Sequence, residues 1–316
     1  MAQHKSFVFF DCECANCFDG IGKICSLGYV LTDDELNVIE SEDVIINPET
    51  DFDWYLLNPK NECHLAYSKD YFRAFPNFES YYKEIKKLFT TGNRYIAGYD
   101  VSNDVDFVNC ACERYKQQFI QFRAFDLKKY LNKVYNTNKK LVEWAEFFEC
   151  DISSLKSHKS VDDAMMTMLI LKKECEKTGK SAEEIFLEYK DFFVSNEQLL
   201  FQAEERKYKK ELQDKLKRMY NKKAPQPRKN IFNGERFEFD KKLFTDLEFL
   251  LDFAKEIYNY GGVLGEKING KGTVIFADDK IIPPIRQKIK KRGLKIATVE
   301  EIKNKMQKIL LCLSTL

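Results

Sequence analysis

The pattern of apolar and polar positions predicts a sheet with helices in the first part of the chain. Runs rich in β-branched and aromatic residues predict strands; they cover residues 6–10, 24–32, 43–47, 94–99 and 122–126. Stretches whose apolar residues recur every three or four positions predict helices; they cover residues 78–89, 104–118, 140–149 and 161–177. Three successive strands followed by alternating helices and strands indicate an α/β fold, a mixed sheet flanked by helices.

The pattern changes after residue 180. Residues 182–223 are heavily charged and have the character of one long helix. The prolines in APQPRKN (224–230) cannot continue a helix, so a linker is expected there. The residues that remain are too many for a tail and predict a small α/β domain. The expected division is a first domain at 1–180, a charged helical linker at 181–230 and a second domain at 231–316.

Composition is that of a soluble globular protein, with 44% hydrophobic and 32% charged residues among 316. No apolar stretch approaches the roughly 20 residues needed to cross a bilayer, and the opening MAQHKS lacks a signal-peptide pattern. Ten cysteines without such a signal favour free thiols over a disulfide framework. These features predict a cytoplasmic protein with no membrane partner.

The net charge of +1 is unevenly spread. Residues 1–203 carry 24 Lys and Arg against 34 Asp and Glu, residues 204–229 carry 11 against 4, and residues 230–316 carry 16 against 12. An acidic first part and a basic second part indicate separate roles. The basic segment is either a solvated spacer or a contact for nucleic-acid phosphates, with Tyr208 and Tyr220 among its lysines.

The first predicted strand ends in two acidic residues, in the stretch FVFFDCEC (7–14). Residues two apart in a strand point to the same side, so Asp11 and Glu13 are expected to point together. Two like charges side by side are unfavourable unless a cation lies between them. The alternative is a strand that simply ends in a polar loop.

Two later segments carry acidic residues in similar contexts. Asp104 stands at the start of a predicted helix directly after a strand, and Phe107 is expected to pack that helix on the sheet. In HKSVDDA, His158 precedes Asp163 by five residues, and Asp163 begins another amphipathic helix. The neighbouring Asp162 competes with Asp163 for the same role and is expected to be solvent-exposed.

The segments DCE, SNDVDFV and HKSVDDA, in this order over roughly residues 6–177, resemble the DEDDh family of 3′→5′ exonucleases. The resemblance implies a ribonuclease H-like fold and hydrolysis assisted by two Mg²⁺ or Mn²⁺ ions. It implies that Asp11 bridges both ions, that Glu13 and Asp163 complete the shell of one, and that Asp104 holds the other. His158 would be the general base, because its ordinary pKa is close to neutral.

The resemblance is incomplete around two of the motifs. Cys14, Ala15 and Asn16 stand where many relatives carry two threonines and a glycine. Their backbone and side-chain groups are candidate contacts for the terminal nucleotide and its sugar. Tyr99 and Asn103 occupy positions where many relatives carry other residues, and they are candidate contacts for the base.

The stretch CECANCFDGIGKIC raises the alternative of a zinc site. It contains Cys12, Cys14, Cys17 and Cys25. Structural zinc sites usually have paired C-x2-C turns, whereas Cys12 and Cys14 flank Glu13 on a strand. We therefore expect packing thiols that point away from the acidic residues.

Residues 231–310 show a β-α-β-α-β order, with Gly261 and Gly262 ending the first helix, and resemble a BRCT domain. The tryptophan usual in the last helix of that family is missing. The resemblance implies a protein partner or a phosphate-bearing one, such as a phosphopeptide or a DNA end. Lys242 and Lys280 are candidate anion contacts or ordinary surface lysines.

The sequence therefore predicts a metal-dependent 3′→5′ exonuclease acting on single-stranded 3′ ends. DNA is the first expected substrate, because of the pairing of the two domains. The alternatives are an exoribonuclease that trims RNA ends and a catalytically weak nucleic-acid-binding or scaffold protein.

Overall fold

The computed structural model describes residues 5–224, 227 and 230–314. The chain divides into two compact units, residues 1–202 and 203–316, and the division falls within helix α9 (Asn196–Lys217). The first unit extends past the expected boundary at residue 180 because the chain adds a strand to its sheet at Phe193–Ser195.

The first unit is built on a mixed sheet of six strands, which confirms the expected fold class. The strands are β1 (Ser6–Cys14), β2 (Ile24–Thr32), β3 (Val38–Ile45), β4 (Arg94–Gly98), β5 (Arg123–Asp126) and β6 (Phe193–Ser195). Their order is β3-β2-β1-β4-β5-β6. β4 and β5 run parallel to β1, while β2, β3 and β6 run antiparallel to their neighbours.

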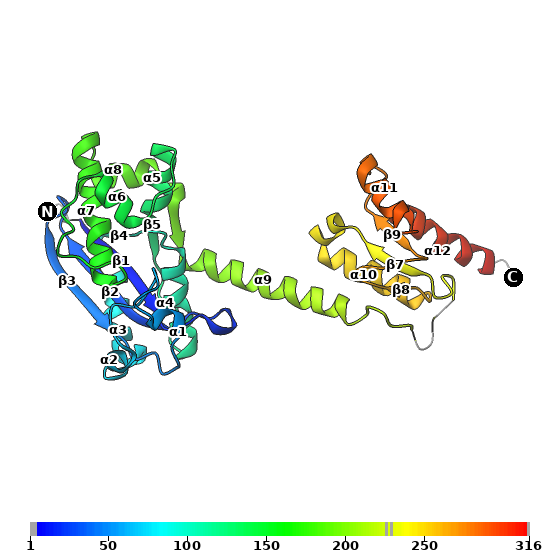
Figure 1. The fold of residues 1–316 in the computed structure, drawn as a ribbon, viewed down its shortest axis with the longest axis horizontal. Coiled ribbons are helices and arrows are strands. Elements are labelled where there is room, and N and C mark those ends of the chain that lie inside the picture. The colour runs from blue at the N-terminus through cyan, green and yellow to red at the C-terminus, as the bar shows by residue number, and fades with distance from the viewer. Residues whose placement is uncertain (1–4, 225–226, 228–229, 315–316) are drawn as a thin grey trace. The chain divides into compact units, whose positions relative to one another are not determined.

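Alternating side chains of β1 divide the core of the first unit into two clusters. Val8 and Phe10 pack with helices α3 and α4 on one face of the sheet. Phe7 and Phe9 pack with helices α5 to α8 on the other face (Figure 1). The unbroken apolar run of β1 thus arises because both faces of this strand are covered.

The helices of the first unit are α1 (Trp54–Leu57), α2 (Lys69–Arg73), α3 (Phe78–Thr90), α4 (Ser102–Arg114), α5 (Leu127–Tyr135), α6 (Leu141–Phe147), α7 (Ser160–Thr178) and α8 (Ala182–Glu188). Short 3-10 turns occur at Phe18–Gly20 and Lys190–Phe192. In the part of the chain that the structure describes, no helix is long and apolar enough to span a bilayer.

The expectation of one helix over residues 182–223 is wrong. Helix α8 ends at Glu188, a 3-10 turn and β6 follow, and α9 then runs to Lys217. The interruption is aromatic, since Phe192 and Phe193 pack against the core around α5 and α8. A charged helix could not supply this contact.

The second unit is a four-stranded parallel sheet with helices on both faces. Its strands are β7 (Arg236–Phe239), β8 (Val263–Leu264), β9 (Thr273–Phe276) and β10 (Lys295–Thr298), in the order β10-β9-β7-β8. Helices α10 (Leu247–Asn259) and α12 (Val299–Ser314) share one core with Leu212 and Leu216 of α9. Helix α11 (Pro283–Lys291) packs in a separate cluster with Val274 and Phe276 of β9.

Candidate active site

The acidic residues of β1 lie just beyond the stretch that pairs with β4. β1 pairs with β4 from Ser6 to Phe9, and with β2 further along, where Asp11 lies opposite Gly28 and Glu13 opposite Ser26. After β4 the chain turns into helix α4. Asp11 and Glu13 therefore lie at the end of the sheet where the first turn of α4 begins.

Asp104 is fixed to β1 by a backbone hydrogen bond. It lies in the first turn of α4, and its side chain is buried. Its Oδ1 accepts a hydrogen bond from the backbone N–H of Cys12 at 3.1 Å. Because Cys12 stands between Asp11 and Glu13, this bond brings a third carboxylate to the end of the strand.

Helix α7 brings the fourth carboxylate, and a glycine allows its close approach. A Cβ on Gly28 would lie 1.9 Å from the backbone nitrogen of Val161, so only glycine lets the first turn of α7 lie directly on β2. Ser160 fixes the same turn, because its Oγ bonds Asp43 at 2.8 Å. Asp163, one turn into the helix, is thereby held beside Asp11, which pairs with Gly28.

His158 lies on the turn that precedes α7. Its backbone adopts a left-handed conformation with φ of 62°, and its N–H donates to Asp163 Oδ2 at 3.0 Å. Its Nδ1 lies 3.7 Å from Glu13 Oε1. The imidazole is half-buried, so it reaches both the carboxylates and solvent.

Asp162 is buried, and the expectation that it is exposed is wrong. Its Oδ2 accepts a hydrogen bond from the backbone N–H of Lys156 at 3.0 Å, and its Oδ1 pairs with Lys159 at 3.0 Å. Both partners flank His158 in the sequence. Asp162 therefore ties down the turn that carries the histidine.

These groups line a cavity of about 830 Å³. Asp11, Glu13, Asp104, His158 and Asp163 all contribute to it, so the five residues predicted for catalysis converge. Tyr99, Asn103 and Phe107 form part of the wall, and Phe107 also packs on the core of the sheet, as expected.

The residues that follow the first motif lie elsewhere. Cys14, Ala15 and Asn16 are not among the residues lining this cavity. Asn16 is buried, and its side chain accepts the N–H of Phe18 and donates to the carbonyl of Asp51. The N–H of Ala15 donates to the carbonyl of Lys23. Contact of these three residues with a nucleotide stays a prediction.

Three lysines of the wall carry no sequence signal that would have identified them. Lys128 pairs with Asp100 at 2.7 Å, and Lys140 pairs with Glu62. Lys139 also lines the cavity. The local context of these residues is that of ordinary charged surface positions, and the fold brings them together from α5 and the segment that leads into α6.

The four cysteines near the site, Cys12, Cys14, Cys17 and Cys25, are free thiols. Cys12 and Cys25 are buried in the core, as expected. Cys14 Sγ lies 3.5 Å from Cys17 Sγ. Within the described residues, the two groups of side chains spaced to hold a metal ion contain no cysteine.

Burial and mutual repulsion perturb the acidic residues. Burial raises the pKa of Asp11 well above its usual value, and the carboxylates of Asp104, Glu13 and Asp163 raise it further. Burial likewise raises the pKa of Asp104 well above its usual value, against the effect of the Cys12 N–H. Burial, followed by repulsion from Glu13, raises the pKa of Asp163 to about 7. Interaction with Glu13 raises the pKa of His158.

The donor set fits divalent cations. Within the described residues, Asp11 Oδ2 and Asp163 Oδ1 are buried and accept no hydrogen bond. Ligand atoms of Glu13, His158 and Asp163 lie within 4.8 Å of one another. Carboxylate oxygens are the ligands that Mg²⁺ and Mn²⁺ prefer, and positive charge between them would remove the repulsion that raises these pKa values.

Comparison with known proteins gives a family for this site. The family model described as "Exonuclease" (RNase T) matches residues 8–171, more than half of the chain. No curated protein matches the sequence significantly.

Several solved structures are similar in part. A 3′-exonuclease from a structure of histone mRNA stem-loop recognition is 14% identical, with a TM-score of 0.47 over 57% of this chain and 84% of that one. The nuclease domain of 3′hExo, a DEDDh family member bound to rAMP, is 16% identical, with a TM-score of 0.46 over 56% and 93%. E. coli exonuclease I with single-stranded DNA and zinc is 20% identical, with a TM-score of 0.47 over 56% and 42%.

Proposed function

The chain belongs to the exonuclease family, and from that premise we propose that it removes nucleotides from the 3′ end of single-stranded nucleic acid, DNA first, with the help of two divalent ions. The observation that carries the proposal is the convergence of four carboxylates and one histidine in a single cavity. Two of those carboxylates have buried oxygens without a hydrogen-bond donor within the described residues.

Each acidic residue has a task in this proposal. Asp11, Glu13, Asp104 and Asp163 would hold Mg²⁺ or Mn²⁺ ions. When bound, such ions neutralise charge on the attacking and leaving oxygens of a phosphodiester. The Cys12 N–H orients Asp104, and the His158 N–H orients Asp163.

His158 would take the proton from the attacking water. Its imidazole lies beside the carboxylates and keeps access to solvent. Glu13 raises its pKa, which favours the protonated product of that transfer. The hydrogen bond between its own backbone and Asp163 couples the position of the base to that of a metal ligand.

The side chains in the walls of the cavity suit the 3′-terminal nucleotides of a single strand. Tyr99 and Phe107 offer aromatic surface for a base, and Asn103 offers an amide. Lys139 offers positive charge for the backbone of the preceding nucleotides, and Lys128 and Lys140 would do so if a phosphate displaced their partners Asp100 and Glu62. A terminal nucleotide must reach the buried carboxylates, which favours a single-stranded or frayed end.

The test follows product formation on an oligonucleotide labelled at its 5′ end. With Mg²⁺ or Mn²⁺, DNA carrying a free 3′ hydroxyl should shorten stepwise, and Asp11→Asn and His158→Ala should abolish this. RNA of the same sequence decides between the deoxyribonuclease and the exoribonuclease alternatives. Absence of metal-dependent shortening of either substrate would favour the catalytically weak scaffold and refute the proposal.

For the second unit we propose a BRCT-like partner-binding module. Four parallel strands in the order β8-β7-β9-β10, connected through α10, a loop and α11, support that resemblance. The basic segment is more than a solvated spacer, because Leu212 and Leu216 are buried in this unit and Tyr208 bonds Glu248. Contact of its exposed lysines with phosphates remains part of the proposal.

A further inference from the structure

The second unit has a cavity of its own at the end of an interior strand. The cavity measures about 1340 Å³ and is lined by Phe239, the last residue of β7, and by residues that follow β7 and β8. Asn221, Phe244 and Asn269 complete the uncharged part of its lining. It lies within the second unit, apart from the catalytic cavity of the first.

The strand order places this cavity where open parallel sheets usually bind ligands. The chain passes from β7 to β8 on one side, and then to β9 on the other side of β7. The strand order therefore reverses next to β7. Ligands of open α/β sheets bind beyond the carboxyl ends of strands at such a reversal.

The lining is strongly positive. It contains Lys241, Lys267, Lys288, Lys291 and Arg292 against two carboxylates, Glu238 and Glu266. Arg292 and Glu238 neutralise each other in a partly buried ion pair, and Glu238 also accepts the N–H of Ile268. Four lysines and one carboxylate are left facing the cavity.

None of the four lysine ammonium groups forms an ion pair or a side-chain hydrogen bond within the described residues. The segment PPIRQKIKKRG (283–293), which contains α11, carries five Lys and Arg and no acidic residue. Helix α10, in the other core cluster of this unit, carries residues of both signs, among them Lys255 paired with Asp252. Basic charge is thus concentrated on the α11 face.

We propose that this cavity binds the phosphate backbone of a single-stranded nucleic acid, at a site that is separate from the catalytic one. The choice of nucleic acid rests on the proposed function, since the first unit belongs to a nuclease family. Tethering a binding site to the catalytic unit raises the effective concentration of substrate at that unit.

The chemistry of the cations favours a polynucleotide over a phosphopeptide. A single phosphate group is best recognised by a guanidinium that forms two parallel hydrogen bonds. The guanidinium in this lining, Arg292, is already bound to Glu238. Lysines distributed over three segments around a large cavity act as point charges, which suits a series of phosphates.

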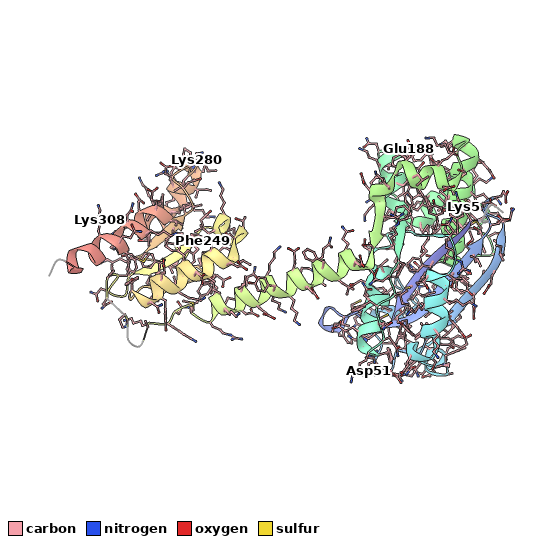
Figure 2. All side chains as sticks on the ribbon, turned by 180° about the vertical axis from the view of Figure 1, so that it is seen from behind. Lys5, Asp51, Glu188, Phe249, Lys280 and Lys308 are labelled. Atoms are coloured by element: carbon pink, nitrogen blue, oxygen red, sulfur yellow. The ribbon has the colours of Figure 1, made fainter. Side chains whose placement is uncertain are left out.

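Binding in the full chain provides the test. The background variant Asp11→Asn keeps a fluorescent single-stranded DNA intact, and anisotropy gives the Kd over a series of salt concentrations. Lys288→Glu with Lys291→Glu should weaken binding and lower the slope of log K against log salt by about 1.4, since each lost phosphate contact removes about 0.7 for a single strand. Lys255→Glu with Lys308→Glu, on α10 and α12, is the control with the same change in net charge (Lys308 is labelled in Figure 2).

Each outcome is decisive. Loss of affinity and slope in the cavity variant, but not in the control, supports the site. Unchanged affinity and slope in the cavity variant, or equal losses in both variants, overturn it. Loss of binding to a phosphoserine peptide with unchanged DNA binding assigns the cavity to phosphopeptides and also overturns it. Because binding is measured without turnover, a failure of the proposed exonuclease activity would not affect this result.

Discussion

Replacing Asp163 with asparagine should stabilise the metal-free protein while abolishing hydrolysis. Asp163 is buried beside Asp11 and Glu13, and burial with repulsion from Glu13 raises its pKa from 3.8 to about 7. Asparagine is isosteric and uncharged, and its side-chain oxygen can still accept the N–H of His158. The variant therefore removes a penalty that only a bound cation relieves.

The magnitude follows from the pKa and depends on pH. Below pH 3.8 the carboxyl is protonated in both the folded and the unfolded chain, and it has no effect on stability. Between 3.8 and about 7 the unfolded chain releases the proton and the folded chain retains it, so the free energy of unfolding falls as pH rises. Above pH 7 the full loss applies, which at about 1.4 kcal/mol per pKa unit is about 4 kcal/mol.

Urea unfolding followed by tryptophan fluorescence measures this effect in the first unit alone. The two tryptophans, Trp54 and Trp144, both lie in that unit. In EDTA, Asp163→Asn should gain up to about 4 kcal/mol at pH 8 and progressively less as the pH is lowered toward 5. Asp162→Asn is the matched control, because it loses a salt bridge with Lys159 and should be destabilised.

Saturating Mg²⁺ should narrow the stability difference between Asp163→Asn and the wild type at pH 8. The wild type gains about 2.7 kcal/mol when the ion is at a hundred times its Kd, and the variant gains less. If Asp163→Asn is less stable than the wild type at pH 8 in EDTA, or if its effect is the same at every pH, the reasoning about a repulsive carboxylate cluster is refuted.

Three further predictions concern two supports of the site and one pair of thiols beside it. Gly28→Ala introduces a Cβ 1.9 Å from Val161 N and should lower kcat about 100-fold by displacing α7. Gly92→Ala is the control: its left-handed backbone (φ of 73°) is strained by a Cβ, but the Cβ meets open space, so kcat should be unchanged. Equal kcat values in the two variants would exclude the role of Gly28. Asp162→Ala should lower kcat by at least about tenfold and leave Mg²⁺ affinity unchanged, because it loosens the turn that carries His158. This loss is a fraction of the 10²- to 10⁴-fold rate increase that a positioned general base provides. A loss of Mg²⁺ affinity would contradict a role limited to that turn. Hydrogen peroxide should join Cys14 and Cys17, whose sulfurs lie 3.5 Å apart, in a disulfide. Mass spectrometry would detect it as the loss of two hydrogens, and Cys17→Ser should not show this loss. Persistence of both free thiols would show that the two sulfurs do not reach bonding geometry.

The parts of the fold that the sequence predicted best are those with strong local patterns. β2 matches its expected range, Ile24–Thr32, and α3 and α7 agree with theirs to within a residue at each end. The convergence of Asp11, Asp104 and Asp163 was expected because their motifs resemble those of the DEDDh exonucleases, whereas the element periods alone did not bring them together. Helix α5 was not expected, since its apolar stripe is short and comes directly after β5.

Features that depend on distant contacts were not predictable. Asp162 looks like a surface residue in the sequence, and its burial depends on the N–H of Lys156 and the ammonium of Lys159. The need for glycine at position 28 arises from a helix more than a hundred residues later in the chain. The cavity of the second unit takes its four unpaired lysines from three separate segments, none of which has a recognisable motif.

The most direct test of the account compares a free and a blocked 3′ end on a labelled strand. Two DNAs that differ only in a free or a phosphate-blocked 3′ terminus are incubated with the wild-type chain, Mg²⁺ and a 5′ label. The account predicts a ladder of stepwise products from the free end, none from the blocked end at early times, and none from either with Asp11→Asn. Cleavage inside the blocked strand, or products that persist in EDTA or in Asp11→Asn, would contradict it.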